Sequence, residues 1–325
     1  MQTRPLARAV LAAAFLWVMF GPCAPTARAE APPPEKIFVG VYLNQLNSID
    51  LKAGTFSADF WLWFRWSGVG ASPLDTFEII GGRVLSKSNV IKKKLPDGLS
   101  YDAARINASI TKQWALAHFP FDDHTINIQI EDAERETARA VYTADKTNEG
   151  VDPSVSVSGW RIANHSDEVQ EHVYHSNYGD TSIPTGAESH YSRYVFSVEL
   201  ERMGQGRFFK FFFGLFVATL ASWCGFFIRP KDASPRVSVS IGALFAAAAV
   251  TLSINNQLPD VAYLTLADKM VFLSLGMILL SLVGTVCSLS LHYLGKESTH
   301  RTLDRVGAVA FPLLYAGILF AIVRG

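Results

Sequence analysis

Residues 56–66 have the sequence FSADFWLWFRW, in which every second side chain from the first onward is apolar. Period-two alternation is typical of a β-strand with one buried face and one solvated face. The same alternation recurs at residues 126–130 and 193–200, where Arg193 falls on the solvated face. Residues 30–207 are therefore expected to form an all-β, immunoglobulin-like sandwich of two packed antiparallel sheets.

The second part of the chain, residues 208–325, is mostly apolar and predicts a transmembrane domain with four helices. A helix needs about 20 apolar residues to cross a bilayer. The expected spans are residues 208–228, 237–254, 266–291 and 306–323. The second span contains several hydroxyl side chains, so we expect it to face other helices or water rather than lipid. The fold class is therefore a multidomain membrane protein, with a β-sandwich followed by a four-helix transmembrane bundle.

Basic residues indicate how the spans are oriented. They occur between spans one and two and between spans three and four, namely Arg229, Lys231, Arg236, Lys296, Arg301 and Arg305. The loop at residues 255–263 contains no basic residue. Since basic loops stay in the cytoplasm, the sandwich and the C-terminus are expected on the outer side of the membrane.

The first 29 residues are typical of a secretion signal. Arg4 and Arg8 precede the apolar residues 9–20, and the sequence ARA at residues 27–29 predicts cleavage before Glu30. An uncleaved membrane anchor is the alternative interpretation. Export of the sandwich agrees with the charge pattern, so we expect a multi-pass membrane protein with an exported sandwich.

Composition excludes several classes of function. The 29 basic and 29 acidic side chains balance, so nothing indicates a nucleic-acid partner. The exported part has no cysteine after the signal, and hence no disulfide or cysteine nucleophile. Metalloprotease, serine-hydrolase and phosphate-loop motifs are absent from the sequence, so we expect neither an enzyme nor a cofactor.

Three motifs together resemble the Cys-loop receptor superfamily of pentameric ligand-gated ion channels. The first is Phe119-Pro120-Phe121-Asp122 before a strand, and the second is Asp304-Arg305-Val306 followed by Phe311-Pro312 in the last span. The third is Gln257-Leu258-Pro259 after the second span. Lys112 and Ile126 stand where animal members have the cysteine pair, as expected of a bacterial member. The resemblance therefore implies a multi-pass protein of the bacterial inner membrane with a periplasmic sandwich.

The resemblance implies a ligand-gated, and alternatively proton-gated, ion channel subunit that works as a homopentamer in a lipid bilayer. Its partners would be four identical subunits, a small-molecule or proton agonist and the permeant ions. Some features depart from the family pattern: Gly214 replaces a common proline, residues 67–105 form a short segment without the Trp-x-Pro-Asp pattern, and the loop Gly295–Leu303 is very short. A non-conducting, membrane-anchored periplasmic binding protein is therefore the main alternative.

The resemblance also implies that the second span lines the pore. Steps of three and four residues place one set of side chains on a single helix face: Ser238, Gly242, Phe245, Ala249, Leu252 and Asn256. A ring of five Phe245 side chains would expel water and form a hydrophobic gate. The alternative is that Phe245 packs against a neighbouring helix.

The cytoplasmic mouth of the pore is expected at Asp232, Ser234, Pro235 and Arg236. The sequence Pro-Arg-Val at residues 235–237 is similar to the pattern of anion-selective members, which favours anions or weak selectivity. Asp232 is an alternative acidic ring, and Arg236 is alternatively expected to reach lipid or to pair with Asp232.

The resemblance places the coupling interface between sandwich and pore at Phe119, Pro120, Phe121, Asp122, Arg202 and Pro259. A buried Arg202 near Asp122 would form a charge-assisted pair. Alternatively, Arg202 is an interfacial anchor.

Ligand binding is expected under the loop at residues 174–191. The candidates are Trp160, Tyr174, His175, Tyr178, His190 and Tyr191. Aromatic rings of this kind can surround a cation or stack on a ring. Ordinary surface packing is the alternative, and Trp160 is alternatively a core residue. A metal site is not expected, although His172 with His175, or the acids Glu131, Asp132, Glu134 and Glu136, would be the candidates.

Overall fold

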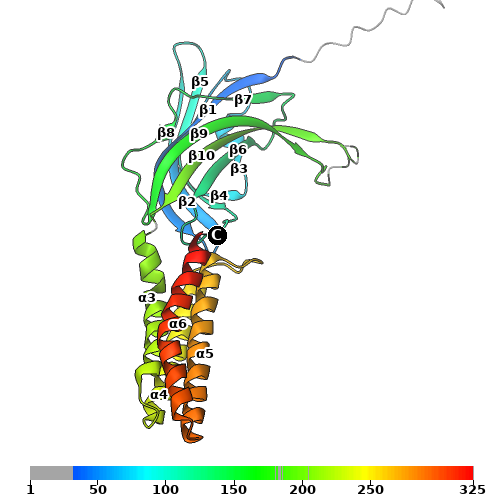
Figure 1. The fold of residues 1–325 in the computed structure, drawn as a ribbon. Helices are drawn as coiled ribbons and strands as arrows, with labels where there is room; N and C mark the ends of the chain where they lie inside the picture. The colour runs from blue at the N-terminus through cyan, green and yellow to red at the C-terminus, as the bar shows by residue number, and fades with distance from the viewer. Residues whose placement is uncertain (1–31, 180, 182–183, 185, 204, 325) are drawn as a thin grey trace, which may run out of the picture. The chain divides into compact units, whose positions relative to one another are not determined.

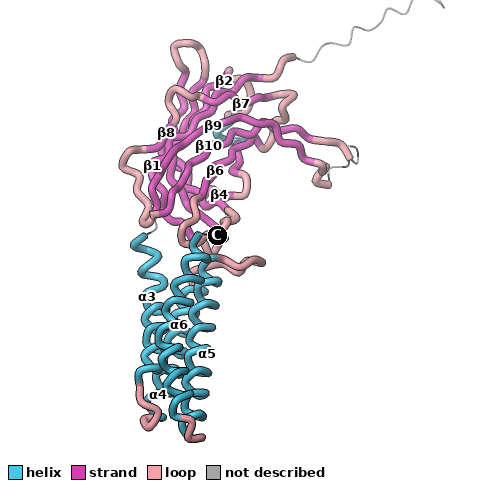
Figure 2. Tube along the Cα trace, viewed as in Figure 1, coloured by secondary structure: helices cyan, strands magenta, loops and turns pink. Residues whose placement is uncertain are grey.

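The structure is a computed structural model that describes residues 32–179, 181, 184, 186–203 and 205–324. The predicted signal sequence lies outside these residues. The described chain consists of strands up to Arg202, followed by long helices from Gln205 onward (Figures 1 and 2). The strands are β1 (Glu35–Asp50), β2 (Thr55–Trp66), β3 (Phe77–Ile79), β4 (Gly82–Lys94), β5 (Ser100–Thr111), β6 (His124–Asp132), β7 (Ala140–Ala144), β8 (Gly150–Val151), β9 (Trp160–Tyr174) and β10 (Ser189–Arg202).

The strands form the two sheets that the alternation predicts. One sheet has the order β4-β5-β2-β1-β7, with β8 also paired to β1, and the other has the order β3-β6-β10-β9. In the first sheet Phe60 of β2 is paired with Leu43 of β1 and with Ile106 of β5. A short helix, α2 (Pro73–Thr76), precedes β3.

The core of the sandwich is built from the alternating side chains of β2. Phe56, Phe60, Leu62 and Phe64 are buried, together with Phe196 of β10 in the other sheet. Their polar neighbours in the sequence fall on the opposite face of the same strand, as the pleat of a strand requires. The predicted β-sandwich is confirmed.

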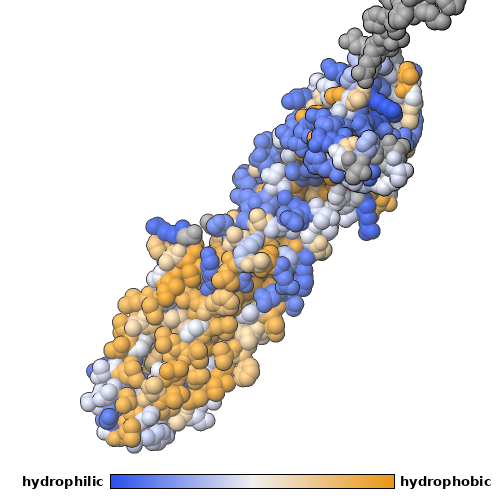
Figure 3. Space-filling model, turned by 90° about the vertical axis from the view of Figure 1, so that its right-hand side faces the viewer, coloured by the Kyte–Doolittle hydropathy of each residue, from blue (hydrophilic) through white to orange (hydrophobic). Residues whose placement is uncertain are grey.

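Four helices follow the sandwich and are long and apolar enough to cross a membrane. They are α3 (Gln205–Trp223), which continues into the 3-10 turn η1 (Cys224–Phe227), α4 (Ala233–Asn255), α5 (Leu266–Tyr293) and α6 (Glu297–Arg324). The surface of the helices is largely hydrophobic, whereas that of the sandwich is largely hydrophilic (Figure 3).

The helix α6 begins at Glu297, well before the apolar residues that mark the predicted span, so the loop between α5 and α6 is shorter than the predicted Gly295–Leu303. The added turns are polar, and Glu297 lies 2.8 Å from His300 and 3.6 Å from Arg301 at helical spacing. Such pairs support the start of a helix.

Glycines allow close packing around the end of α3. A Cβ atom at Gly307 of α6 would lie 2.5 Å from the ring of Phe226, and one at Gly284 of α5 would lie 3.2 Å from it. The Trp223 indole N–H donates to the carbonyl oxygen of Ala308 at 2.9 Å. The turn η1 is therefore held directly against α5 and α6.

Candidate functional site

The helix α4 has two distinct faces. One face is buried against the rest of the subunit and carries Arg236, Ser240, Ala243, Ala247 and Ile254. All the predicted pore-lining side chains are exposed instead: Ser238, Gly242, Phe245, Ala249, Leu252 and Asn256. Phe245 is 72% exposed and Leu252 is 66% exposed. Phe245 therefore does not pack against a helix of its own subunit.

Arg236 differs from the prediction for the pore mouth. Its side chain is fully buried and forms an ion pair with Asp304 of α6. Arg236 is therefore not exposed at the predicted mouth. It also does not reach lipid, and its charge partner is Asp304 rather than Asp232. The other residues of the predicted mouth, Asp232, Ser234 and Pro235, are exposed. The expected anion preference depended on Arg236, so this burial removes its main support.

Aromatic rings join the motif Phe119-Pro120-Phe121-Asp122 to the first membrane helix. The Phe119 ring meets Phe211 edge-on at 5.3 Å between centroids, and the Phe121 ring stacks on Phe208 at 5.3 Å. The peptide bond between Phe119 and Pro120 is cis. The loop between β5 and β6 thus contacts α3 through two of its predicted coupling residues.

Arg202 and Asp122 form the charge-assisted pair that the sequence predicts. The guanidinium Nη2 lies 2.8 Å from Asp122 Oδ2, and both side chains are buried, at 0% and 3% exposed. His124 Nε2 lies 2.6 Å from the same carboxylate oxygen. Burial tends to raise the pKa of Asp122, but the hydrogen bonds from His124 and Arg202 outweigh it and hold that pKa below its usual value.

The loop between α4 and α5 contacts the sandwich through residues that sequence reasoning missed. The backbone N–H of Leu116 donates to the Tyr263 hydroxyl at 2.9 Å, and the N–H of Leu266 donates to the carbonyl oxygen of Ala117 at 2.9 Å. Pro259, which was predicted to belong to the coupling interface, is half-buried in this loop. A tyrosine in a loop carries no signal of such a contact in the sequence.

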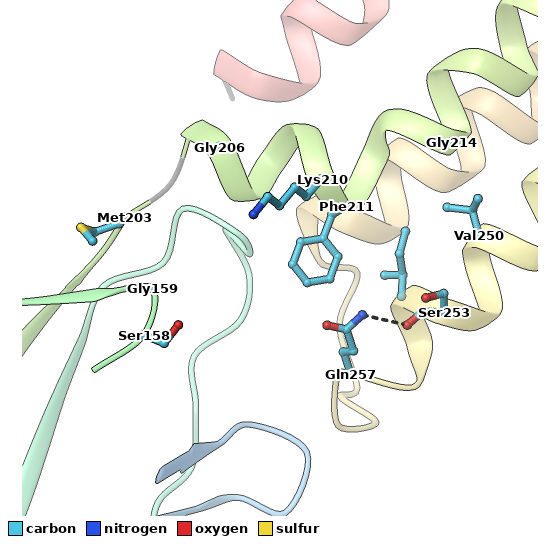
Figure 4. Close-up of a pocket in the computed structure, with 11 residues that line it drawn as sticks. Ser158, Gly159, Met203, Gly206, Lys210, Phe211, Gly214, Val250, Ser253 and Gln257 are labelled. Carbon is cyan, nitrogen blue, oxygen red and sulfur yellow. Dashed lines mark hydrogen bonds between the residues drawn. The ribbon is translucent and has the colours of Figure 1, made fainter. Parts of the chain in front are cut away.

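An open cavity of about 710 Å³ lies beside this junction (Figure 4). Ser158, Gly159 and Met203 line it from the strand ends, whereas Lys210, Gly214, Val250 and Gln257 are among the residues that line it from α3, α4 and the start of the following loop. A Cβ atom at Gly214 would lie 2.8 Å from Val250 Cγ2, so glycine permits the close approach of α3 and α4 at this level. The membrane helices are therefore not packed tightly against the strand ends here.

Three of the predicted ligand residues lie together at the far end of β9 and β10. The Tyr174 ring is 5.6 Å from Tyr191 and 6.1 Å from Tyr178, both in edge-on arrangements. The Tyr174 hydroxyl donates to Glu131 Oε2 at 2.9 Å. Burial and the Glu131 carboxylate raise the pKa of Tyr174 to about 12, so this hydroxyl keeps its proton. We call Tyr174, Tyr178 and Tyr191 the tyrosine cluster.

A buried ion pair lies beneath the tyrosine cluster. Arg193 Nε lies 2.5 Å from Glu131 Oε1, and Arg193 Nη2 lies 3.2 Å from the Tyr174 hydroxyl. The alternation placed Arg193 on the solvated face, but the structure buries it because Glu131 of the neighbouring strand β6 compensates its charge. The cluster thus combines aromatic rings with one buried charge of each sign.

The remaining ligand candidates do not join the tyrosine cluster. His175 lies 3.2 Å from Glu188 and His190 lies 2.9 Å from Glu171, with the carboxylates largely exposed. Trp160 is at the other end of β9, roughly 45 Å of extended chain from Tyr174. There the Arg202 guanidinium lies 4.0 Å from the Trp160 ring centroid, so Trp160 belongs to the junction.

The acids that were considered as calcium ligands are partly engaged by other groups. Asp132 pairs with Arg135 at 2.5 Å and accepts a hydrogen bond from Thr76 at 2.9 Å. Glu131 is already paired, as described above. Among the described residues, the group of side chains whose atoms lie close enough to hold a metal ion is elsewhere, at His292, Glu297 and His300.

Comparison with known proteins identifies similar chains. No family model matches the sequence. The chain is 22% identical over 315 residues to the proton-gated ion channel of Gloeobacter violaceus, an overlap that covers 90% of this chain and 84% of that channel. It is also 22% identical over 247 residues to the human gamma-aminobutyric acid receptor subunit rho-3, covering 70% of this chain and 49% of that subunit.

Proposed function

Since this chain belongs to the pentameric ligand-gated ion channel family, we propose that five copies assemble around a central pore lined by the exposed face of α4. The chain is a channel subunit and a multi-pass membrane protein with four helical spans, rather than an enzyme. The observation that carries the proposed pore is the division of α4 into a buried face within the subunit and an exposed face with Phe245 at its centre.

The gate that we propose is a ring of five Phe245 side chains. A narrow apolar constriction expels water and so blocks ions without any fixed charge. Phe245 is the bulkiest residue on the exposed face, and it is followed by three alanines before Ala249. Opening requires α4 of each subunit to move outward until the ring becomes wide enough to hold water.

The proposed trigger is a proton or a small molecule that acts on the exported sandwich. The relative from Gloeobacter violaceus is named as proton-gated, which supports the first possibility. The tyrosine cluster and its buried Arg193–Glu131 pair support a small ligand with an aromatic or charged group. Movement then passes through the contacts of Phe119 and Phe121 with α3 and through Tyr263 to the loop after α4.

For the permeant ion we propose cations. Asp232 and Arg236 are the two charged residues of the predicted mouth, and only Asp232 is exposed. An exposed carboxylate from each of five subunits forms an acidic ring, which attracts cations. The buried Arg236 contributes no charge to that ring, because Asp304 neutralises it.

Ionic current through the purified protein in a planar bilayer tests this function. We expect current that grows on acidification or with a ligand, a reversal potential that follows the cation gradient, and a larger resting current for Phe245→Ala. The matched control is Phe272→Ala, because Phe272 is a similarly exposed phenyl ring on α5. Silence of wild type and Phe245→Ala as intact pentamers would instead support the non-conducting periplasmic binding protein.

A further inference from the structure

A compact group of metal-binding side chains joins the end of α5 to the start of α6. His292 Nδ1 lies 2.8 Å from Glu297 Oε1, and His300 Nε2 lies 2.8 Å from Glu297 Oε2. One ligand atom from each of the three residues lies within 4.8 Å of the other two. The carboxylate therefore stands between two imidazole rings, whose centroids are 5.1 Å apart.

We propose that His292, Glu297 and His300 bind a divalent transition-metal ion of the zinc type. Imidazole nitrogen and carboxylate oxygen are typical ligands of such ions, at about 2.0–2.2 Å. Tetrahedral ligands at that distance are roughly 3.3 Å apart, so small side-chain rotations suffice here. His292 is also in the last turn of α5, where the helix dipole favours a cation.

The surroundings of His300 support a metal rather than a simple ion pair. With Nε2 directed at the metal position, its other nitrogen, Nδ1, lies 4.0 Å from Asp304 Oδ2. A carboxylate behind a metal-bound histidine orients the ring and strengthens the ligand. Within the described residues Nδ1 has no hydrogen-bond partner although it is buried, so a small movement toward Asp304 would satisfy it.

The same carboxylate connects the proposed metal to the pore-lining helix. Asp304 forms the ion pair with the buried Arg236 near the start of α4. A chain of contacts therefore runs from the metal through His300 and Asp304 to Arg236. The metal would thus fix the arrangement of α4, α5 and α6 at the end of the bundle that the positive-inside pattern places in the cytoplasm. The binding site itself does not depend on conduction.

The test is binding of Zn²⁺ alone to the purified full-length chain, measured by calorimetry, with Co²⁺ absorption spectra as a second readout. We expect one Zn²⁺ per chain and at least a tenfold loss of affinity in His292→Ala/His300→Ala. The control is His172→Ala/His175→Ala, which removes the same number of histidines from the sandwich and should leave this affinity unchanged. Equal affinity of wild type and His292→Ala/His300→Ala would overturn the proposal.

Glu297→Gln and Asp304→Asn separate metal binding from folding. Glu297→Gln keeps the shape of the side chain but removes a ligand charge, so weaker Zn²⁺ binding with an unchanged elution profile supports the site, and unchanged binding contradicts it. Asp304→Asn should weaken binding roughly 10- to 100-fold through the orientation of His300. Because these measurements need no current, a failed channel assay would leave their outcome intact.

Discussion

The pair of Asp122 and Arg202 offers the sharpest test of how the sandwich is joined to the membrane helices. Both side chains are almost completely buried, so removing the charge of one takes this counter-charge away from a buried group. Loss of one partner of a buried pair costs about 3–5 kcal/mol. We therefore expect Asp122→Asn to lower the free energy of unfolding of the sandwich by about that amount, measured by urea titration with tryptophan fluorescence in detergent.

An exposed ion pair provides the control for this prediction. Asp75 pairs with Lys92 at 2.6 Å, but its side chain is 53% exposed. Pairs of this kind contribute less than about 1 kcal/mol, so Asp75→Asn should change the free energy of unfolding little. Equal effects of Asp75→Asn and Asp122→Asn would refute the reasoning from burial.

The pH dependence gives the same test a second readout. The pKa of Asp122 is held below its ordinary value, so its contribution to stability is complete above the unfolded-state pKa of about 4. The contribution is lost as the pH falls through the folded-state pKa. The difference in stability between wild type and Asp122→Asn should therefore shrink in strong acid, and a difference that persists there would contradict the assigned cause.

Three further predictions concern other parts of the chain. Burial and the neighbouring Asp167 carboxylate raise the pKa of Glu149 to about 7, so folding takes up a proton. The thermal midpoint of wild type should therefore decrease as the pH rises from 5 to 7, and that of Glu149→Gln should decrease less. Gly307→Val should destabilise the helices by roughly 1–3 kcal/mol in thermal unfolding, because its side chain would collide with Phe226, whereas Gly317→Val has open space and should not. Glu131→Gln leaves the buried Arg193 without its charge partner, so the tyrosine cluster should become less ordered. A higher agonist concentration should then be needed to evoke current. An unchanged concentration dependence would count against a ligand site at the cluster.

The sequence predicts the features that depend on local periodicity. Alternation in residues 56–66 identifies β2 because each buried side chain of a strand is two residues from the next. The six candidate pore residues share one face because a helix repeats every 3.6 residues. The structure exposes that face in a single subunit, and its position around a pore is a proposal.

The features that the sequence could not predict depend on partners far away in the chain. Arg236 was expected at the pore mouth, but its partner Asp304 is 68 residues away on α6. Arg193 was expected in solvent, but its partner Glu131 is 62 residues away on β6. The polar character of a side chain shows that it needs either water or a hydrogen-bonding or charged partner. Which of the two it has depends on the fold.

The Arg236–Asp304 pair also constrains the order in which the subunit can be made. Arg236 belongs to α4 and Asp304 to α6, so Arg236 leaves the ribosome well before its partner. Until α6 is synthesised, the guanidinium lacks the Asp304 carboxylate, and burying it without a counter-charge is costly. We therefore expect the end of the bundle that holds this pair to close only after α6 has been made.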